Sequence, residues 1–178
     1  MIGIVLVAVG FVLFHNAWFG LFGTIKDAEK AGKTLSVVNF LGGAAILAVS
    51  LIVMSQGEYG EGYFSAMIYL VVGLTYIYIG FDHLFGLDPK AFGVFCLTGA
   101  IALFIGGVTT ITGAGEAGLD GRGIWLVIMW FSWAFLWGVL FLECAFEKKF
   151  GKLTAIICLL TTFYTGWIPG IMMLTGWW

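Results

Sequence analysis

Six long apolar runs dominate this sequence and limit what it can fold into. Each run extends for about 20 residues, the length that an α-helix needs to cross the hydrocarbon core of a bilayer. The runs are continuous, whereas the strands of a membrane β-barrel alternate apolar and polar residues over roughly ten positions. The sequence therefore predicts six transmembrane helices, at approximately residues 1–22, 35–54, 63–81, 91–111, 124–142 and 153–174.

Composition excludes a water-soluble fold. Hydrophobic residues make up 61% of the 178 positions and charged residues only 10%, whereas a soluble chain has to cover its surface with polar side chains. A bilayer accepts an apolar exterior and demands only that backbone groups pair internally. We therefore expect an all-α integral membrane protein, with residues 1–178 forming a single transmembrane domain. The first run lacks a basic segment before it, so we expect a retained helix rather than a signal peptide.

Basic residues are unevenly distributed among the short connections between these runs. Basic side chains favour the cytoplasmic side of a membrane. The first, third and fifth connections are therefore predicted to be cytoplasmic, and both termini are predicted to lie on the outer side. Those three connections hold Lys26, Lys30, Lys33, Lys90, Lys148, Lys149 and Lys152, whereas the other two hold Arg122 and the acidic residues Glu58, Glu61, Glu116 and Asp120.

Motifs for covalent chemistry or cofactor binding do not occur in the sequence. Cys96, Cys144 and Cys158 are widely separated and match no metal-binding spacing. A P-loop, a dinucleotide fingerprint and a Ser-His-Asp set are also missing. The formal net charge is −2, and no basic stripe offers nucleic acid a binding face. We expect no catalytic residue, no metal, no cofactor and no nucleic-acid partner.

A weak internal repeat places a polar residue before Phe-Gly near the end of the first, third and fifth runs. These polar residues are Asn16, Asp82 and Glu143. The repeat predicts three helical hairpins, in which each odd-numbered helix leads through a turn into the next helix. Polar groups near the apolar region are costly unless paired or hydrated. Two interpretations stay open: the three residues line a polar vestibule, or they cap helix ends and face lipid headgroups.

A tryptophan stripe is the strongest local feature of the fifth run. Trp130, Trp133 and Trp137 follow the i, i+3, i+7 spacing of one helix face and lie inside the span, away from the interfacial belt that tryptophan usually occupies. Tyr78 places a phenol on the third run. Aromatic walls with a few hydrogen-bond donors suit a small, flat, neutral amide, but the same rings also suit a tightly packed bundle.

These residues together resemble the urea and short-chain amide channel family, the AmiS/UreI family of bacterial inner-membrane proteins. The resemblance spans essentially the whole chain and rests on the order and spacing of several segments. They are Met1-Ile2-Gly3-Ile4-Val5-Leu6 with His15-Asn16, Leu74-Thr75-Tyr76-Ile77-Tyr78 leading to Asp82-His83-Leu84-Phe85-Gly86-Leu87-Asp88, the tryptophan stripe with Glu143, Gly151-Lys152-Leu153-Thr154, and Trp167-Ile168-Pro169.

The resemblance implies six helices built from three hairpins, a pore through each protomer, and a homo-hexamer in the bacterial cytoplasmic membrane. It also implies urea or a short-chain amide as substrate, with a cytoplasmic urease or amidase as partner enzyme. Thr161 stands where an acid-gated member has a carboxylate in the sixth helix, and is a candidate pore position. By position, the lining residues would be Ile2, Leu6, Val9, Leu13, Asn16, Leu74, Tyr78, Trp130, Trp133, Leu136, Trp137 and Glu143.

The expected function is passive conduction without acid gating. A channel that opens between about pH 7 and 5 needs a group that titrates in that window, and histidine is the natural one. The outer connections contain no histidine. Two other functions stay open: a proton-coupled transporter that uses Asp82 or Glu143 with a neighbouring histidine, and a non-conducting membrane scaffold in which aromatic stripes and glycines serve only packing.

Overall fold

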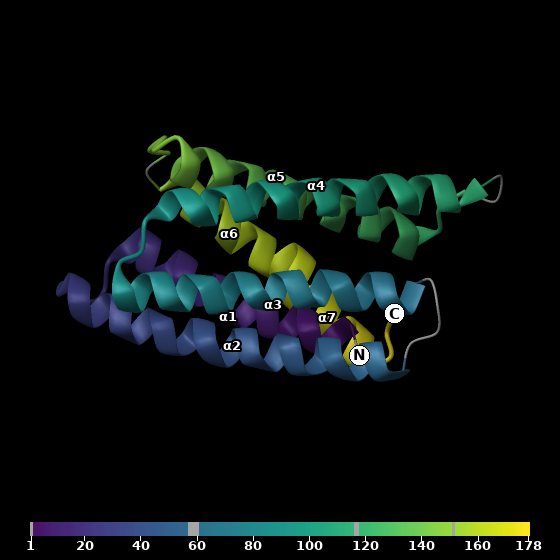
Figure 1. The fold of residues 1–178 in the computed structure, drawn as a ribbon. Helices are drawn as coiled ribbons and strands as arrows, with labels where there is room; N and C mark the ends of the chain where they lie inside the picture. The colour runs from purple at the N-terminus through teal and green to yellow at the C-terminus, as the bar shows by residue number, and fades with distance from the viewer. Residues whose placement is uncertain (1, 57–60, 116–117, 151) are drawn as a thin grey trace. The chain divides into compact units, whose positions relative to one another are not determined.

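The computed structural model describes residues 2–56, 61–115, 118–150 and 152–178, with backbone alone for 61, 62 and 65. Within these ranges every regular element is a helix, and short connections join the helices (Figure 1). The elements are α1 (Ile2–Phe22), α2 (Ala28–Gln56), α3 (Glu61–Phe85), α4 (Pro89–Gly113), α5 (Gly121–Ala145), α6 (Leu153–Thr161), the π-helical segment η2 (Thr162–Trp167) and α7 (Ile168–Leu174).

Among the described residues, six helical stretches are long and apolar enough to cross a membrane, which confirms the predicted number and order of spans. The sixth stretch combines α6, η2 and α7. The stretches are Ile2–Phe22, Ala28–Gln56, Ala66–Phe85, Pro89–Gly113, Gly121–Ala145 and Leu153–Leu174. The placement of the two termini on the outer side of the membrane stays a prediction.

Several helices extend beyond the predicted apolar runs. The clearest case is α2, which begins at Ala28 rather than near residue 35. Its first turns are polar and contain an ion pair between Lys33 and Glu29, one helical turn apart. The apolar pattern marks only the part of a helix that lies in hydrocarbon, so the predicted beginning near residue 35 is too late for this helix.

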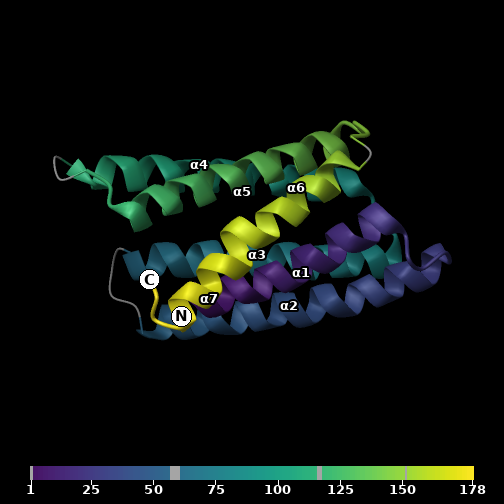
Figure 2. The same cartoon turned by 180° about the vertical axis from the view of Figure 1, so that it is seen from behind.

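The chain divides into two compact units. One unit consists of Met1–Asp88 with Gly151–Trp178, and the other of Pro89–Phe150. The first therefore holds α1, α2, α3 and the sixth span, and the second holds α4 and α5. Two views from opposite sides show α2 beside α3 and α4 beside α5 (Figures 1 and 2). The expectation of one transmembrane domain over residues 1–178 stays a prediction.

Glycines lie where helices within each unit approach most closely. A Cβ atom at Gly43 of α2 would lie 2.9 Å from the carbonyl oxygen of Gly73 on α3, and one at Gly3 of α1 would lie 2.9 Å from that of Gly170 on α7. In lipid the hydrophobic effect does not drive helices together. Small residues favour their association instead, because they permit close van der Waals packing. α1 also contacts α2, but α2–α3 and α4–α5 are the most extensively packed pairs. The three predicted hairpins, which begin at odd-numbered helices, stay a prediction.

The sequence predicts one helix at about residues 153–174. The structure instead has α6, the π-helical segment η2 and α7 in this span. Pro169 has no N–H group to donate to the carbonyl of Thr165, and its ring crowds that carbonyl. The π-helical turn η2 lies directly before this position. Its wider winding accommodates the crowding. Buried hydroxyl groups here bond to their own helix: Thr162 Oγ1 donates to the Cys158 carbonyl at 2.9 Å and Thr165 Oγ1 to the Thr161 carbonyl at 2.6 Å.

The packing of α4 on α5 predicts a strong effect of one added methyl group. A Cβ at Gly99 would lie 1.6 Å from Cζ3 of Trp137, whereas one at Gly138 would meet nothing within 4 Å. We expect Gly99→Ala to lower the free energy of unfolding by about 1–3 kcal/mol. Gly138→Ala should be neutral or slightly stabilising, since alanine favours helix. Thermal unfolding in detergent, monitored by size-exclusion chromatography, measures the stability of both variants. Equal stability of the two variants would contradict this packing.

Candidate functional site

A stripe of predicted lining residues runs along α1. Ile2, Leu6, Val9, Leu13 and Asn16 recur every three or four positions and so share one helix face. The exposed fractions of the three central side chains are 2%, 2% and 8%, and the two outer ones are partly buried. The structure thus places this stripe on the side of α1 that other parts of the chain cover.

The remaining predicted residues of this unit differ in burial. Thr161 is 1% exposed, at the end of α6. Tyr78 is partly buried on α3, whereas Leu74, one turn earlier on the same helix, is 41% exposed. Leu74 is therefore the least covered of the lining residues predicted for this unit.

An amide pair joins α1 to α2 near the connection formed by residues 23–27. Nδ2 of Asn16 donates to Oδ1 of Asn39 at 3.0 Å, and Nδ2 of Asn39 donates back to Oδ1 of Asn16 at 2.9 Å. Asn39 is fully buried, and its Nδ2 also donates to the carbonyl of Leu35 at 2.8 Å. Asn39 is not among the predicted site residues. The signal that could have identified it is an amide inside the apolar run 35–54, where unpaired polar groups are costly.

In the other unit the tryptophan stripe of α5 is buried. Trp130, Trp133 and Trp137 are 8%, 5% and 6% exposed, and Leu136 is 2% exposed. The ring of Trp137 fills the space that Gly99 of α4 leaves open. One member of the stripe thus has a packing role within its own unit, whatever its part in permeation. Glu143, near the end of α5, is partly buried.

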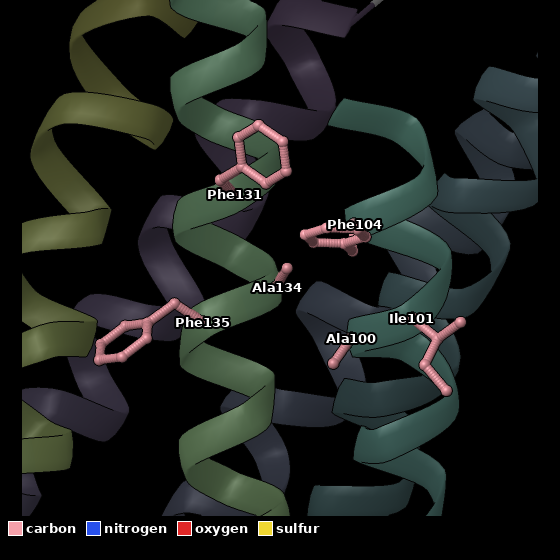
Figure 3. A pocket seen from close by; sticks show the side chains of 6 residues that line it. All are labelled: Ala100, Ile101, Phe104, Phe131, Ala134 and Phe135. Atoms are coloured by element: carbon pink, nitrogen blue, oxygen red, sulfur yellow. The ribbon is translucent and has the colours of Figure 1, made fainter. Parts of the chain in front are cut away.

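A shallow apolar pocket of about 450 Å³ lies between α4 and α5. No lining side chain carries a polar group, so the pocket offers an amide no side-chain hydrogen bond. Its residues differ from the predicted pore positions of α5. Figure 3 shows the lining side chains, which are Ala100, Ile101, Phe104, Phe131, Ala134 and Phe135.

The acidic residues of the even-numbered connections are described only in part. Glu58 and Glu116 lie outside the described residues, as does the side chain of Glu61. Asp120 is the N-cap of α5, and its Oδ1 accepts a hydrogen bond from the Gly123 backbone N–H at 2.7 Å. This contact gives Asp120 a structural role, because such a cap satisfies an N–H group that the helix itself leaves unpaired.

Histidines and acids elsewhere form no metal site in the described parts of the chain. His15 Nδ1 donates to the Phe11 carbonyl of its own helix at 2.7 Å. Asp82 and Glu143, two of the polar residues predicted for a vestibule, are both partly buried but belong to different units. The vestibule therefore stays a prediction.

Comparison with known proteins identifies one family along almost the entire chain. Residues 1–177 match the AmiS/UreI family of transporters. Two curated relatives are the acid-activated urea channel of Helicobacter pylori (strain J99 / ATCC 700824), 24% identical over 100% of both chains, and the putative transporter protein AmiS2 of Rhodococcus erythropolis, 27% identical over 96% of this chain and 78% of that one. These are transporters and channels rather than enzymes, and this chain is not an enzyme.

Solved structures give the same result for the fold. The cryoEM structure of the Helicobacter pylori urea channel in its closed state matches with a TM-score of 0.85 and 26% identity over 100% of both chains. The crystal structure of the urea channel from the same organism matches with a TM-score of 0.82 and 25% identity over 100% of this chain and 99% of that one. The six-helix fold is therefore that of a urea channel.

Proposed function

The chain belongs to the AmiS/UreI family of membrane transporters, and from that premise we propose that it is a passive channel for urea or short-chain aliphatic amides. The similarity of the whole chain to a urea channel carries this proposal, and the proposed substrates include short-chain amides because they share the carbonyl and N–H groups of urea. The proposal includes a homo-hexamer in the bacterial cytoplasmic membrane, with both termini on the outer side and a cytoplasmic urease or amidase as partner.

The proposed path is lined by the α1 stripe, the tryptophan stripe of α5 with Leu136, and the side chains of Leu74, Tyr78 and Thr161, with Asn16 and Glu143 as polar groups near the inner end. An ion would have to lose its water there without replacement ligands, which is a large barrier. Urea and acetamide carry no net charge. They can lie flat against indole and phenol faces and exchange a few hydrogen bonds.

Flux into proteoliposomes tests this function. We expect urea and acetamide to cross without a proton gradient and without electrical current, because the proposed cargo is neutral and the path is apolar. Uptake of labelled solute measures flux, and planar-bilayer recording measures current. Protein-free liposomes and liposomes with an unrelated membrane protein are the controls.

The other two candidate functions predict different results in the same assay. Flux that requires a proton gradient and carries current would identify the protein as a proton-coupled transporter rather than a channel. No flux above the control liposomes, from correctly folded protein, would favour a non-conducting scaffold.

Trp133 offers the clearest test of the aromatic stripe. It is 5% exposed, whereas Trp177 near the C-terminus is 82% exposed. We expect Trp133→Ala to change urea flux, or the preference for urea over acetamide, several-fold, because it removes a proposed wall of the path. Trp177→Ala is the matched control. Trp137 is less suitable, since its packing on Gly99 would confuse the two roles. Equal effects of the two tryptophan variants would assign the stripe to packing.

Acid should not be needed for conduction, unlike in the relative named as acid-activated. The outer connections lack histidine, Asp120 serves as a helix cap, and Thr161 places no carboxyl group in the sixth span. We expect similar urea flux at external pH of about 7.5 and about 5 with internal pH clamped, since only histidine normally titrates in this window. A several-fold rise at acid pH that disappears in Glu58→Gln with Glu61→Gln would show that acidic side chains gate the channel.

A further inference from the structure

The indole ring of Trp137 on α5 lies directly on the backbone of α4 at Gly99. A Cβ atom at Gly99 would lie 1.6 Å from Cζ3 of that ring, 1.8 Å from Cε3 and 3.0 Å from Cη2. These separations are far inside van der Waals contact, so no residue with a side chain can stand at position 99 while the ring keeps its place. The six-membered ring of Trp137 therefore occupies the space that a side chain would need.

A second contact from the same helix holds the ring close to α4. Phe95 lies one turn before Gly99 on α4. Its ring and that of Trp137 have centroids 6.3 Å apart and planes inclined by 35°, within the range of attractive aromatic pairs. Trp137 is only 6% exposed. Two positions on one face of α4 thus fix where this ring lies.

An added methyl group at position 99 can be accommodated in two ways: the ring moves, or α4 moves away from α5. Movement of α4 is costly, because the two helices already touch at their backbones. A Cβ at Gly93 would lie 2.6 Å from the backbone nitrogen of Ala145, and separating the helices would lose such contacts along a closely packed pair. A modest rotation about the side-chain torsions costs less, so the ring is the part that yields.

The direction in which the ring yields follows from the edge that meets Gly99. Cε3 and Cζ3 lie on the edge of the indole opposite Nε1, so a methyl group at position 99 would push the ring toward its N–H edge and away from α4. None of the proposed lining residues belongs to α4. The proposed path therefore lies on another side of Trp137, and a ring displaced from α4 narrows it.

We propose that Gly99 is a positioning residue for Trp137, and that the two together set the largest amide that can pass. Gly99 does so by letting the indole lie against α4 instead of in the path. The inference rests on the proposed function, in which Trp137 lines the path, and deepens it, because it names what limits the length of the amide's carbon chain.

A purely structural role for Gly99, as a site of close packing between α4 and α5, has a matched control at Gly107. That residue also lies on α4 below an aromatic ring of α5, since a Cβ there would lie 2.8 Å from Cζ of Phe131. Phe131 is not a proposed lining residue and borders the shallow pocket between the two helices (Figure 3). Gly107→Ala thus disturbs the same helix pair and leaves Trp137 untouched.

The experiment compares the permeability of proteoliposomes to acetamide and to propionamide, which differ by one CH₂ group. The ratio does not depend on the amount of protein incorporated, and protein-free liposomes supply the background. We expect Gly99→Ala to lower the ratio of propionamide to acetamide permeability by about tenfold, because one methylene in a closely fitting apolar site has an effect of that order. Gly107→Ala should leave the ratio unchanged.

Replacing the ring tests whether Gly99 acts through Trp137. Trp137→Leu removes the atoms that lie on Gly99, so it should raise the ratio. The double variant Gly99→Ala with Trp137→Leu should have at least the wild-type ratio, because leucine leaves room for the methyl group. A packing role alone would change the stability of these variants without this reversal of the ratio.

Size-exclusion chromatography with thermal unfolding confirms that each variant is folded. An unchanged ratio in folded Gly99→Ala would overturn the inference and leave amide conduction intact. So would an equal fall with Gly107→Ala, or a double variant that keeps the lowered ratio. If Gly99→Ala does not fold, or the wild type passes no propionamide, Trp137→Leu decides, and a ratio no higher than that of the wild type would overturn the inference. Wild-type protein that conducts neither urea nor acetamide would instead overturn the proposed function, and this inference with it.

Discussion

Close contact between helix backbones is the constraint on which the rest of this structure depends. Within a bilayer the lipid tails are as apolar as the side chains, so helix association depends on close packing of complementary surfaces. Glycines at the helix crossings provide that fit, as where Gly43 meets Gly73 and where Gly99 receives the ring of Trp137. These contacts set the rotation of each helix within its unit, and so decide which side chains face a neighbouring helix.

Polar groups in the spans show how the chain limits the cost of burying them. The threonines of the sixth span bond to carbonyl groups of their own helix, and Ser50 bonds to a carbonyl of α3. Asn39 differs, because it pairs with a second side chain that keeps part of its own hydrogen-bonding capacity. A buried side chain whose hydrogen bonds are all made rigidifies the contact between the two helices.

Hydrophobic run length was enough to predict the number and order of the spans, because the thickness of the bilayer sets the length of each apolar stretch. It did not predict that α2 begins at Ala28, since its polar first turns carry no apolar signal. The partner of Asn39 could not be predicted from the sequence either, because the residue opposite it depends on the close packing of α1 on α2 at Gly42, where an added Cβ would clash with Val12. The predicted lining residues belong to both units. Their burial within each unit does not test whether they line one path, so their role in permeation stays a prediction.

The π-helical turn of the sixth span has a consequence for comparison with related chains. A π-turn holds one more residue than an α-turn over a similar rise, so the helix face presented after η2 is rotated relative to the face before it. Thr161 precedes that turn and Pro169 follows it. Two homologues that differ in this turn would therefore place different residues on the same face of the span, even where their sequences align without a gap. Equivalent positions in this span are best assigned separately on either side of the turn.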